Sequence, residues 1–78
     1  VVERPIEVRL VREQPAGFYW QKVYYPVAQV LDCWKDTGCW WEGESTKVFY
    51  RVAAPDGSLF ELYRDSREDT WFMYKIYD

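Results

Sequence analysis

The chain has 78 residues, of which 10 are basic and 13 acidic, so its formal net charge is −3. This length fits one small domain covering residues 1–78. An apolar share of 49%, rich in Trp, Tyr and Phe, argues against disorder. The absence of histidine excludes His-ligated metals, His general bases and Ser-His-Asp triads. No apolar run reaches the roughly 18 residues of a membrane helix, so we expect no membrane partner.

The first half of the chain has the pattern of β-strands. Between residues 6 and 11 apolar and polar side chains alternate with period two. The composition of residues 14–17 predicts the turn that follows. Gln21-Lys22 predicts a tight hairpin turn between two aromatic-rich segments, and Pro26 limits its strand to an edge, a bend or a bulge. The strands expected here are residues 6–11, 18–20, 23–25 and 27–34.

The middle of the chain lacks regular alternation. Residues 32–46 hold two Gly, two Cys and three Trp, and they predict a long Trp-rich loop. Beyond it, residues 54–57 (Ala-Pro-Asp-Gly) predict a turn, because Pro presets φ and Gly accepts a positive φ. A further turn at residues 66–69 leads to the last strand. The strands expected in this half are residues 47–54, 58–65 and 70–77.

Together these patterns predict an all-β domain. We expect a small antiparallel barrel or rolled sheet of five to six short strands, SH3-like or similar, with the Trp-rich loop in its middle. No segment fits a helix of three turns. Helix should therefore account for less than about 15% of residues, well under the usual third.

Adjacent aromatic residues place aromatic side chains on both faces of the sheet, because successive residues of a strand face opposite sides. We assign the nearly charge-free alternating positions to the core, and the positions that mix aromatics with charges to an exposed face. The predicted core set is Val48, Tyr50, Val52, Phe60, Leu62, Phe72, Tyr74 and Ile76. The predicted exposed set is Phe49, Arg51, Glu61, Tyr63, Trp71, Met73, Lys75 and Tyr77.

Groups with catalytic or metal-binding chemistry do not converge in the sequence. Cys33 and Cys39, without histidine, cannot complete a four-ligand zinc site. We expect two free thiols rather than a disulfide, because no secretion leader opens the chain. A pair of carboxylates beside a Trp-lined groove would suit a glycosidase, but a chain of this size leaves little room for such a cleft. We therefore predict no enzyme activity, no metal and no cofactor.

A binding role is the function that these residues favour. Tyr, Trp, Met and Arg are enriched at protein interfaces, whereas a solvated surface of cross-strand pairs is the plainer interpretation. We expect contact with another protein or with a second copy of the chain. Single-stranded nucleic acid stacked on the same aromatics is the alternative ligand, although nearby carboxylates dilute its basic track. The predicted partner face comprises Trp40, Trp41, Phe49, Arg51, Tyr63, Trp71, Lys75 and Tyr77.

Several motifs together resemble a family of small bacterial proteins of unknown function, and this resemblance covers nearly the whole chain. It implies an intracellular, cytoplasmic protein with no assigned catalytic residues, and the two cysteines lie outside its motifs. The motifs are Glu3-Arg4-Pro5-Ile6, Phe18-x-Trp20, Val30-Leu31-Asp32-x-Trp34, Thr37-Gly38-x-Trp40-Trp41-x-Gly43, Phe49-Tyr50-Arg51-Val52, Gly57-x-x-x-Glu61-Leu62-Tyr63 and Trp71-x-x-Tyr74-x-x-Tyr77-Asp78.

A second resemblance covers the chain from about Gly38 to Asp78. This half is similar to the C-terminal region of the Y-family polymerase-like subunit of the bacterial mutasome, which works in translesion DNA synthesis. There too a Trp-Trp pair precedes two strands and a closing Trp…Tyr-Asp. The resemblance implies a contact module in DNA-damage tolerance.

Overall fold

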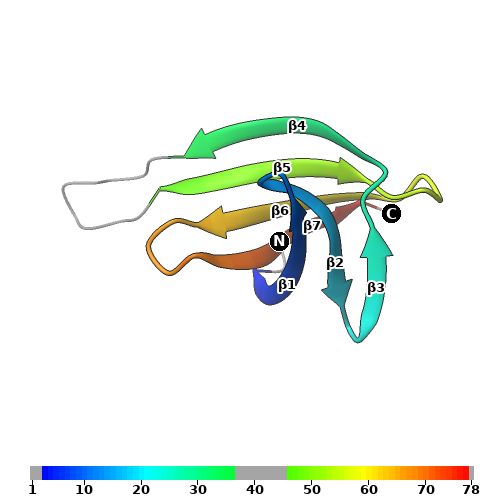
Figure 1. Cartoon of the computed structure of the whole chain (residues 1–78), viewed down its shortest axis with the longest axis horizontal. Coiled ribbons are helices and arrows are strands. Elements are labelled where there is room, and N and C mark those ends of the chain that lie inside the picture. The colour runs from blue at the N-terminus through cyan, green and yellow to red at the C-terminus, as the bar shows by residue number, and fades with distance from the viewer. Residues whose placement is uncertain (1–2, 37–45, 78) are drawn as a thin grey trace.

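The computed structural model describes residues 3–36 and 46–77, and it confirms an all-β domain. The described elements form one antiparallel sheet of seven strands in the order β3-β2-β1-β7-β6-β5-β4 (Figure 1). The predicted count of five to six strands is therefore wrong. No described segment forms a helix that could cross a bilayer. The strands are β1 (Arg4–Val11), β2 (Gln14–Trp20), β3 (Val23–Pro26), β4 (Gln29–Asp36), β5 (Lys47–Ala53), β6 (Leu59–Asp65) and β7 (Thr70–Tyr77).

The sheet curls into a half-barrel because two strands that are consecutive in the chain lie at its opposite edges. Only Val27 and Ala28 separate β3 from β4. Since neighbouring Cα atoms are 3.8 Å apart, so short a link forces the two edges together at one corner. The backbone N–H of Val27 donates to the carbonyl of Ala16 at 2.9 Å, and that of Ala28 donates to the carbonyl of Ala53 at 2.7 Å. The corner is thus tied to both β2 and β5.

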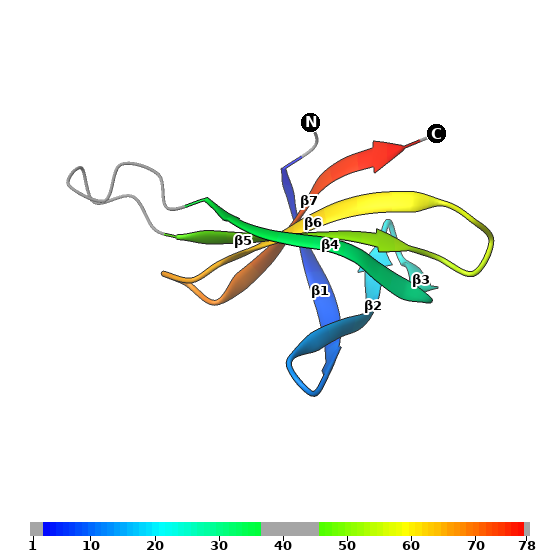
Figure 2. The same ribbon diagram turned by 90° about the horizontal axis from the view of Figure 1, so that it is seen from above.

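Strand β1 belongs to both halves of the curled sheet. Its first residues, Arg4–Ile6, pair with β7, and residues 7–11 pair with β2. Seen from above, β1 runs at a steep angle to β4 and β5 (Figure 2). Side chains of β1, β2 and β3 thereby pack against the same face of β5, β6 and β7. The buried core cluster consists of Phe18, Tyr50, Val52, Ala54, Phe60, Leu62, Trp71 and Met73.

The division of side chains between two faces is confirmed for β5 and β6 and is wrong for the first half of β7. The predicted exposure is wrong for Phe49, Glu61 and Tyr63, which are buried on the face opposite the core. Trp71 and Met73 are buried in the core, whereas Phe72 is only half-buried on the other face. A β-bulge explains the reversal: Glu61 pairs with Lys75 and the next residue of β6, Leu62, pairs with Met73, which leaves Tyr74 as the extra residue. Beyond the bulge, the side chains of β7 again point to the faces predicted for them. Ile76 lies across from core residue Phe60, although it is itself exposed.

The first two hairpins turn on residues with positive φ. The predicted turn at Gln21-Lys22 is confirmed, with φ of 51° and 67°, as a type I′ turn requires. A second such turn lies at Arg12 and Glu13, with φ of 52° and 65°. The turn predicted at residues 14–17 is therefore wrong, because these residues belong to β2. Pro26 does end an edge strand, as expected.

Turn-forming residues fit inside β2 for local reasons. Pro15 pairs with Leu10, and Ala16 is an extra residue of β2 at the register shift opposite Arg9 and Leu10. Bulges are among the few strand sites that accept proline. Gly17 lies beneath the ring of Tyr24, whose hydroxyl oxygen would be 2.0 Å from an added Cβ. The glycine therefore serves a close approach of side chain to backbone, rather than a turn.

The turn between β5 and β6 forms as the sequence predicts. Gly57 has a φ of 90°, and its backbone N–H donates to the carbonyl of Ala54 at 3.0 Å. The carboxylate of Asp56 accepts the backbone N–H of Ser58 at 2.9 Å. This hydrogen bond lowers the pKa of Asp56, because it favours the ionised form.

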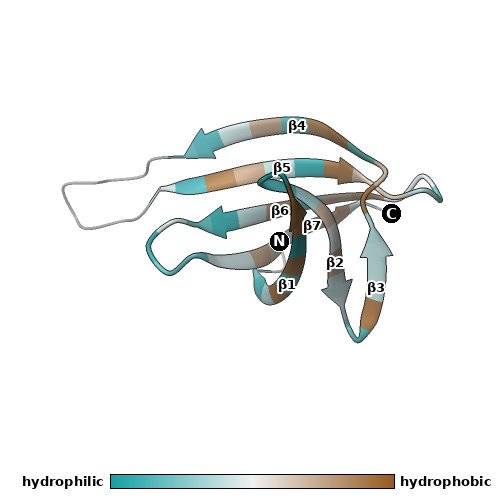
Figure 3. Ribbon diagram, in the orientation of Figure 1, coloured by the Kyte–Doolittle hydropathy of each residue, from teal (hydrophilic) through white to brown (hydrophobic). Residues whose placement is uncertain are grey.

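The predicted Trp-rich loop at residues 32–46 is not borne out by the described part of the chain, and residues 37–45 lie outside it. Residues 32–36 belong to β4, so the loop assignment is wrong there. Asp32, Trp34 and Asp36 lie two residues apart, and they pair with Arg51, Phe49 and Lys47 of β5. Figure 3 shows that both strands contain hydrophilic and hydrophobic stretches, without strict alternation from one residue to the next. Trp40, Trp41 and Cys39 lie outside the described residues.

Candidate functional site on the outer face

The outer face of β4–β7 is the side of these strands that points away from the core cluster. Its centre is a row of aromatic rings, one from each strand, that pair directly across the sheet. The ring centroids are 5.4 Å apart for Trp34 and Phe49, which stack in parallel, and 5.2 Å apart for Phe49 and Tyr63. Tyr63 and Phe72 stack at 5.0 Å. The aromatic row is thus Trp34, Phe49, Tyr63 and Phe72.

Rows of alternating charge lie on both sides of the aromatic row. Because each strand places a residue of opposite sign across from its neighbour, every member faces an attractive partner. One charged row crosses all four strands as Asp32, Arg51, Glu61 and Lys75. The other crosses three strands as Asp36, Lys47 and Asp65.

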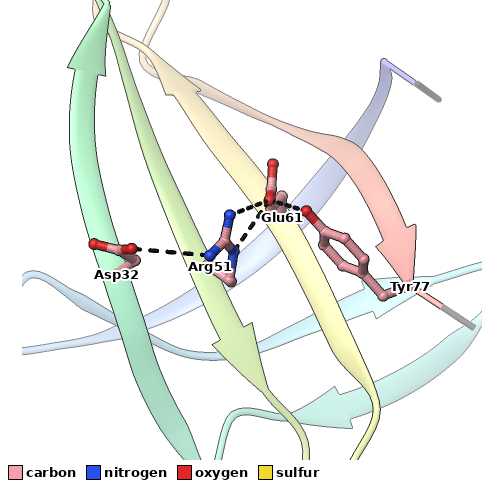
Figure 4. A network of polar contacts seen from close by, with 4 residues as sticks. All are labelled: Asp32, Arg51, Glu61 and Tyr77. Atoms are coloured by element: carbon pink, nitrogen blue, oxygen red, sulfur yellow. Dashed lines mark hydrogen bonds and ion pairs between the residues drawn. The ribbon is translucent and has the colours of Figure 1, made fainter.

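Glu61 is the centre of the first charged row (Figure 4). It is 3% exposed, and a buried carboxylate is stable only when it is paired. Arg51 supplies the pairing through Nε at 3.2 Å and Nη2 at 3.1 Å from Oε2. The hydroxyl of Tyr77 donates to the same oxygen. Asp32 lies 3.9 Å from Arg51 on its far side.

Arg51 joins the charged row to the aromatic rings. Its guanidinium lies 5.6 Å from the ring centroid of Trp34 and 5.9 Å from that of Tyr77, within the range of cation–π attraction. The hydrogen bond to Glu61 raises the pKa of Arg51 above its usual value. Arg51 is therefore a fixed cation held by two rings and by the carboxylates of Glu61 and Asp32.

The outer face has an apolar layer of its own. Phe49 is 7% exposed and Tyr63 5% exposed, as low as residues of the core. Tyr74, the bulge residue, packs its ring edge-on against both, at centroid distances of 5.0 and 5.9 Å. Burial raises the pKa of Tyr63. Trp34, Phe72 and Tyr74 remain half-buried. The part of this layer that solvent can reach therefore consists of aromatic side chains.

Five of the eight residues predicted for the partner face lie together on the outer face: Phe49, Arg51, Tyr63, Lys75 and Tyr77. Trp71 does not, because it is 7% exposed within the core, where its ring lies 5.2 Å from that of Tyr50. Trp40 and Trp41 lie outside the described residues. The predicted face is therefore assembled in part.

Several members of the outer face were absent from the predicted partner face. Asp32 and Trp34 lie where the predicted strand 27–34 overlaps the predicted loop 32–46, and no regular alternation of polar and apolar side chains there distinguishes the two. Phe72 and Tyr74 were assigned to the core because no local pattern announces the bulge between Met73 and Lys75. Only the pairing of β7 with β6 places them correctly.

The described residues form no candidate metal centre. Among residues 3–36 and 46–77 there is no group of three or more Cys, Asp or Glu side chains placed to hold a metal ion. The carboxylate of Glu61 is held by Arg51 and Tyr77. Cys33 is exposed on β4, and the prediction of two free thiols stays a prediction because Cys39 is outside the described part.

Comparison with known proteins shows which family the chain represents. A family model described as "Domain of unknown function (DUF6504)" matches residues 1–78, so the chain belongs to that family. The expected resemblance to a family of unknown function is thereby confirmed. No curated protein and no solved structure matches the chain. No link to the mutasome subunit is shown.

Proposed function

We propose that this DUF6504 domain is a non-enzymatic binding module that contacts another protein through the outer face of β4–β7. The observation that carries the proposal is the aromatic row, whose end members Trp34 and Phe72 remain half-exposed on a face that no described strand covers. Aromatic and Arg side chains in such a setting are the usual anchors of protein interfaces. A role in bacterial DNA-damage tolerance, within the cytoplasm, is the cellular setting that the second resemblance suggests.

The pairing of charges favours a protein partner over nucleic acid. Binding of single strands needs a basic track beside the stacked rings. On the outer face Arg51 is bound to Glu61 at 3.1 Å, and Lys47 lies directly across from Asp36 and Asp65. Lys75 likewise pairs with Glu61 across β6 and β7. A partner with complementary aromatic and polar groups matches this balanced surface better than a polyphosphate does.

Site-specific photo-crosslinking tests the proposal. A benzoylphenylalanine introduced at Phe72 keeps an aromatic ring in the row. On illumination it crosslinks to whatever molecule contacts this position in the cell that expresses the protein. We expect a discrete protein adduct, which mass spectrometry identifies as another protein or as a second copy of the chain. Trp34→Ala should reduce its yield at least about tenfold, the effect of losing an interface anchor worth about 1.4 kcal/mol or more.

Tyr19 provides the matched control, because it is 50% exposed on the opposite half of the sheet. The same crosslinker at Tyr19 should give no discrete protein adduct. Adducts to nucleic acid at Phe72, with binding of a thymidine oligonucleotide that falls steeply with salt, would instead support the alternative function. Equal adducts at both positions, or none at Phe72, would refute the proposed interface.

A further inference from the structure

A pocket of about 520 Å³ opens at the end of the half-barrel, between the β2–β3 hairpin and the turn that joins β5 to β6. Its size lies within the range of small-ligand sites. Of its walls only Tyr77 also belongs to the charged and aromatic arrangement of the outer face, through its hydroxyl. The residues that line the pocket and matter here are Trp20, Tyr25, Asp56, Ser58, Phe60 and Tyr77.

The aromatic walls of this mouth pocket are held in place by the core. Phe60 is 4% exposed, and its ring lies 5.4 Å from that of Tyr25. Tyr25 also stacks on Phe18 at 5.5 Å, and Trp20 packs against the same cluster. Because these rings are fixed by packing, the pocket presents preformed π-surfaces rather than mobile side chains.

Among the described residues that line the pocket, Asp56 carries a negative charge. Asp56 is fixed by its hydrogen bond from the backbone N–H of Ser58 at 2.9 Å. That bond lowers the pKa of Asp56, so the carboxylate is ionised at neutral pH. No basic side chain is among the described residues that line the pocket. Aromatic faces combined with a carboxylate attract an organic cation.

The protein already binds one such cation within its own sheet. The guanidinium of Arg51 lies over Trp34 and Tyr77 and pairs with Glu61. The mouth pocket offers the same combination of rings and a carboxylate, without a cation of the described chain to occupy it. The surroundings of Arg51 therefore indicate what chemistry suits the mouth pocket.

We propose that the mouth pocket binds the side chain of an arginine presented by a partner protein. A guanidinium is planar, stacks on aromatic faces and is more weakly hydrated than an ammonium, so it enters an apolar-walled site more readily than lysine does. It also matches a carboxylate as a hydrogen-bond partner. The net charge of −3 favours encounter with a basic segment. This inference concerns a site separate from the aromatic row and does not rest on the proposed outer-face contact.

Titration with blocked tripeptides tests the assignment. Acetyl-Gly-Arg-Gly-amide is added to the isotope-labelled protein, and the indole N–H resonances are followed, with the citrulline and lysine tripeptides as probes of charge and shape. We expect a saturable shift of Trp20 that exceeds the shift of Trp34. Affinity for the arginine tripeptide should exceed that for citrulline at least fivefold and that for lysine at least twofold.

Two variants connect the binding to the pocket. Asp56→Asn keeps a side-chain oxygen that can accept the Ser58 N–H but removes the charge, and it should weaken arginine binding at least threefold. Trp20→Leu keeps apolar bulk and removes the π-surface, and it should weaken binding further. Tyr24→Ala, an exposed change on the other face of β3, is the matched control and should leave the affinity unchanged.

The outcomes that would overturn the proposal are distinct. Equal affinity for the citrulline tripeptide would show an apolar pocket without selectivity for a cation, and equal affinity for the lysine tripeptide would overturn the assignment to arginine. Full affinity for the arginine tripeptide in Asp56→Asn, whose fold is checked by its circular dichroism, would show that the carboxylate takes no part in binding. This outcome would overturn the proposal even if Trp20→Leu failed to fold. A shift centred on Trp34 would place the binding on the outer face instead.

Discussion

At the scale of single residues, Glu61 and Val23 show that burial in this sheet depends on cross-strand partners as well as on hydropathy. Glu61 is almost fully buried, because Arg51 and Tyr77 satisfy its carboxylate. Val23, an apolar residue, is 51% exposed on the short edge strand β3. A charged residue between two partners is thus better covered than an apolar residue at an edge.

We expect Arg51→Met to lower the free energy of unfolding by about 2 kcal/mol, since it leaves the buried carboxylate of Glu61 without its cation. The value lies below that of a fully buried pair because the Arg51 side chain is 39% exposed. The double change Arg51→Met/Glu61→Met should recover at least half of the loss. Urea denaturation measures both, and a stability unchanged by Arg51→Met would show that the pair contributes little.

Trp71 and Phe72 test which face of β7 is the core. Trp71→Ala should lower the free energy of unfolding by about 3–5 kcal/mol, as for a buried aromatic residue. Phe72→Ala should cost about 1–2 kcal/mol, because its ring is half-buried and packs on Tyr63. Equilibrium denaturation of the two variants decides the matter. A larger loss for Phe72→Ala would contradict the bulge at Tyr74 and restore the alternation predicted from the sequence.

At the scale of elements, two hairpins use turns for which their sequences are poorly suited. Type I′ turns favour Asn-Gly, yet Arg12-Glu13 and Gln21-Lys22 adopt the required positive φ. Non-glycine residues in this region carry strain of order 1 kcal/mol each. The sheet tolerates that strain because the flanking strands pair around both turns.

The double change Gln21→Asn/Lys22→Gly should therefore raise the free energy of unfolding by about 1 kcal/mol, through relief of backbone strain. Thermal and urea denaturation measure the gain. Gly57→Ala is the control in which backbone strain is added instead of removed. An added Cβ would have no atom within 4 Å, but φ is 90°. Backbone strain alone should therefore lower the free energy of unfolding by about 1 kcal/mol. Loss of stability in the Asn-Gly variant would mean that the native side chains make compensating contacts.

At the scale of the whole molecule, the half-barrel depends on the corner at Val27 and Ala28. This two-residue link holds β3 and β4, the two edges of the sheet, at one point. The same closure places the β2–β3 hairpin beside the β5–β6 turn and so forms the mouth pocket. The corner thus connects the topology of the sheet to its candidate ligand site.

Four glycines inserted after Ala28 should lower the free energy of unfolding by at least about 2 kcal/mol, because the insertion releases both edges and the two backbone hydrogen bonds of the corner, each worth about 1 kcal/mol. The same insertion between Arg67 and Glu68, in the exposed β6–β7 turn, is the control. It should cost less than about 1 kcal/mol, the scale expected for lengthening a surface loop. Equal losses at both sites would show that the corner has no special role.

The sequence by itself determined the all-β class, the turns at Gln21-Lys22 and residues 54–57, and which side chains of β5 and β6 point to the same face. These features are encoded locally, because side-chain alternation and turn chemistry involve residues close in the chain. The Phe49, Arg51 and Tyr63 part of the outer face followed from the same alternation. Each of these predictions needed no knowledge of which strands become neighbours.

Only the tertiary structure decided the rest. The bulge at Tyr74 arises from the register between β6 and β7, and it moves Trp71 into the core and Phe72 onto the outer face. The alignment of Trp34 with Phe49 depends on β4 pairing with β5. The mouth pocket joins Trp20 to Asp56, which are remote in the chain. Register and closure are set by contacts between distant segments, so no local pattern in the sequence specifies them.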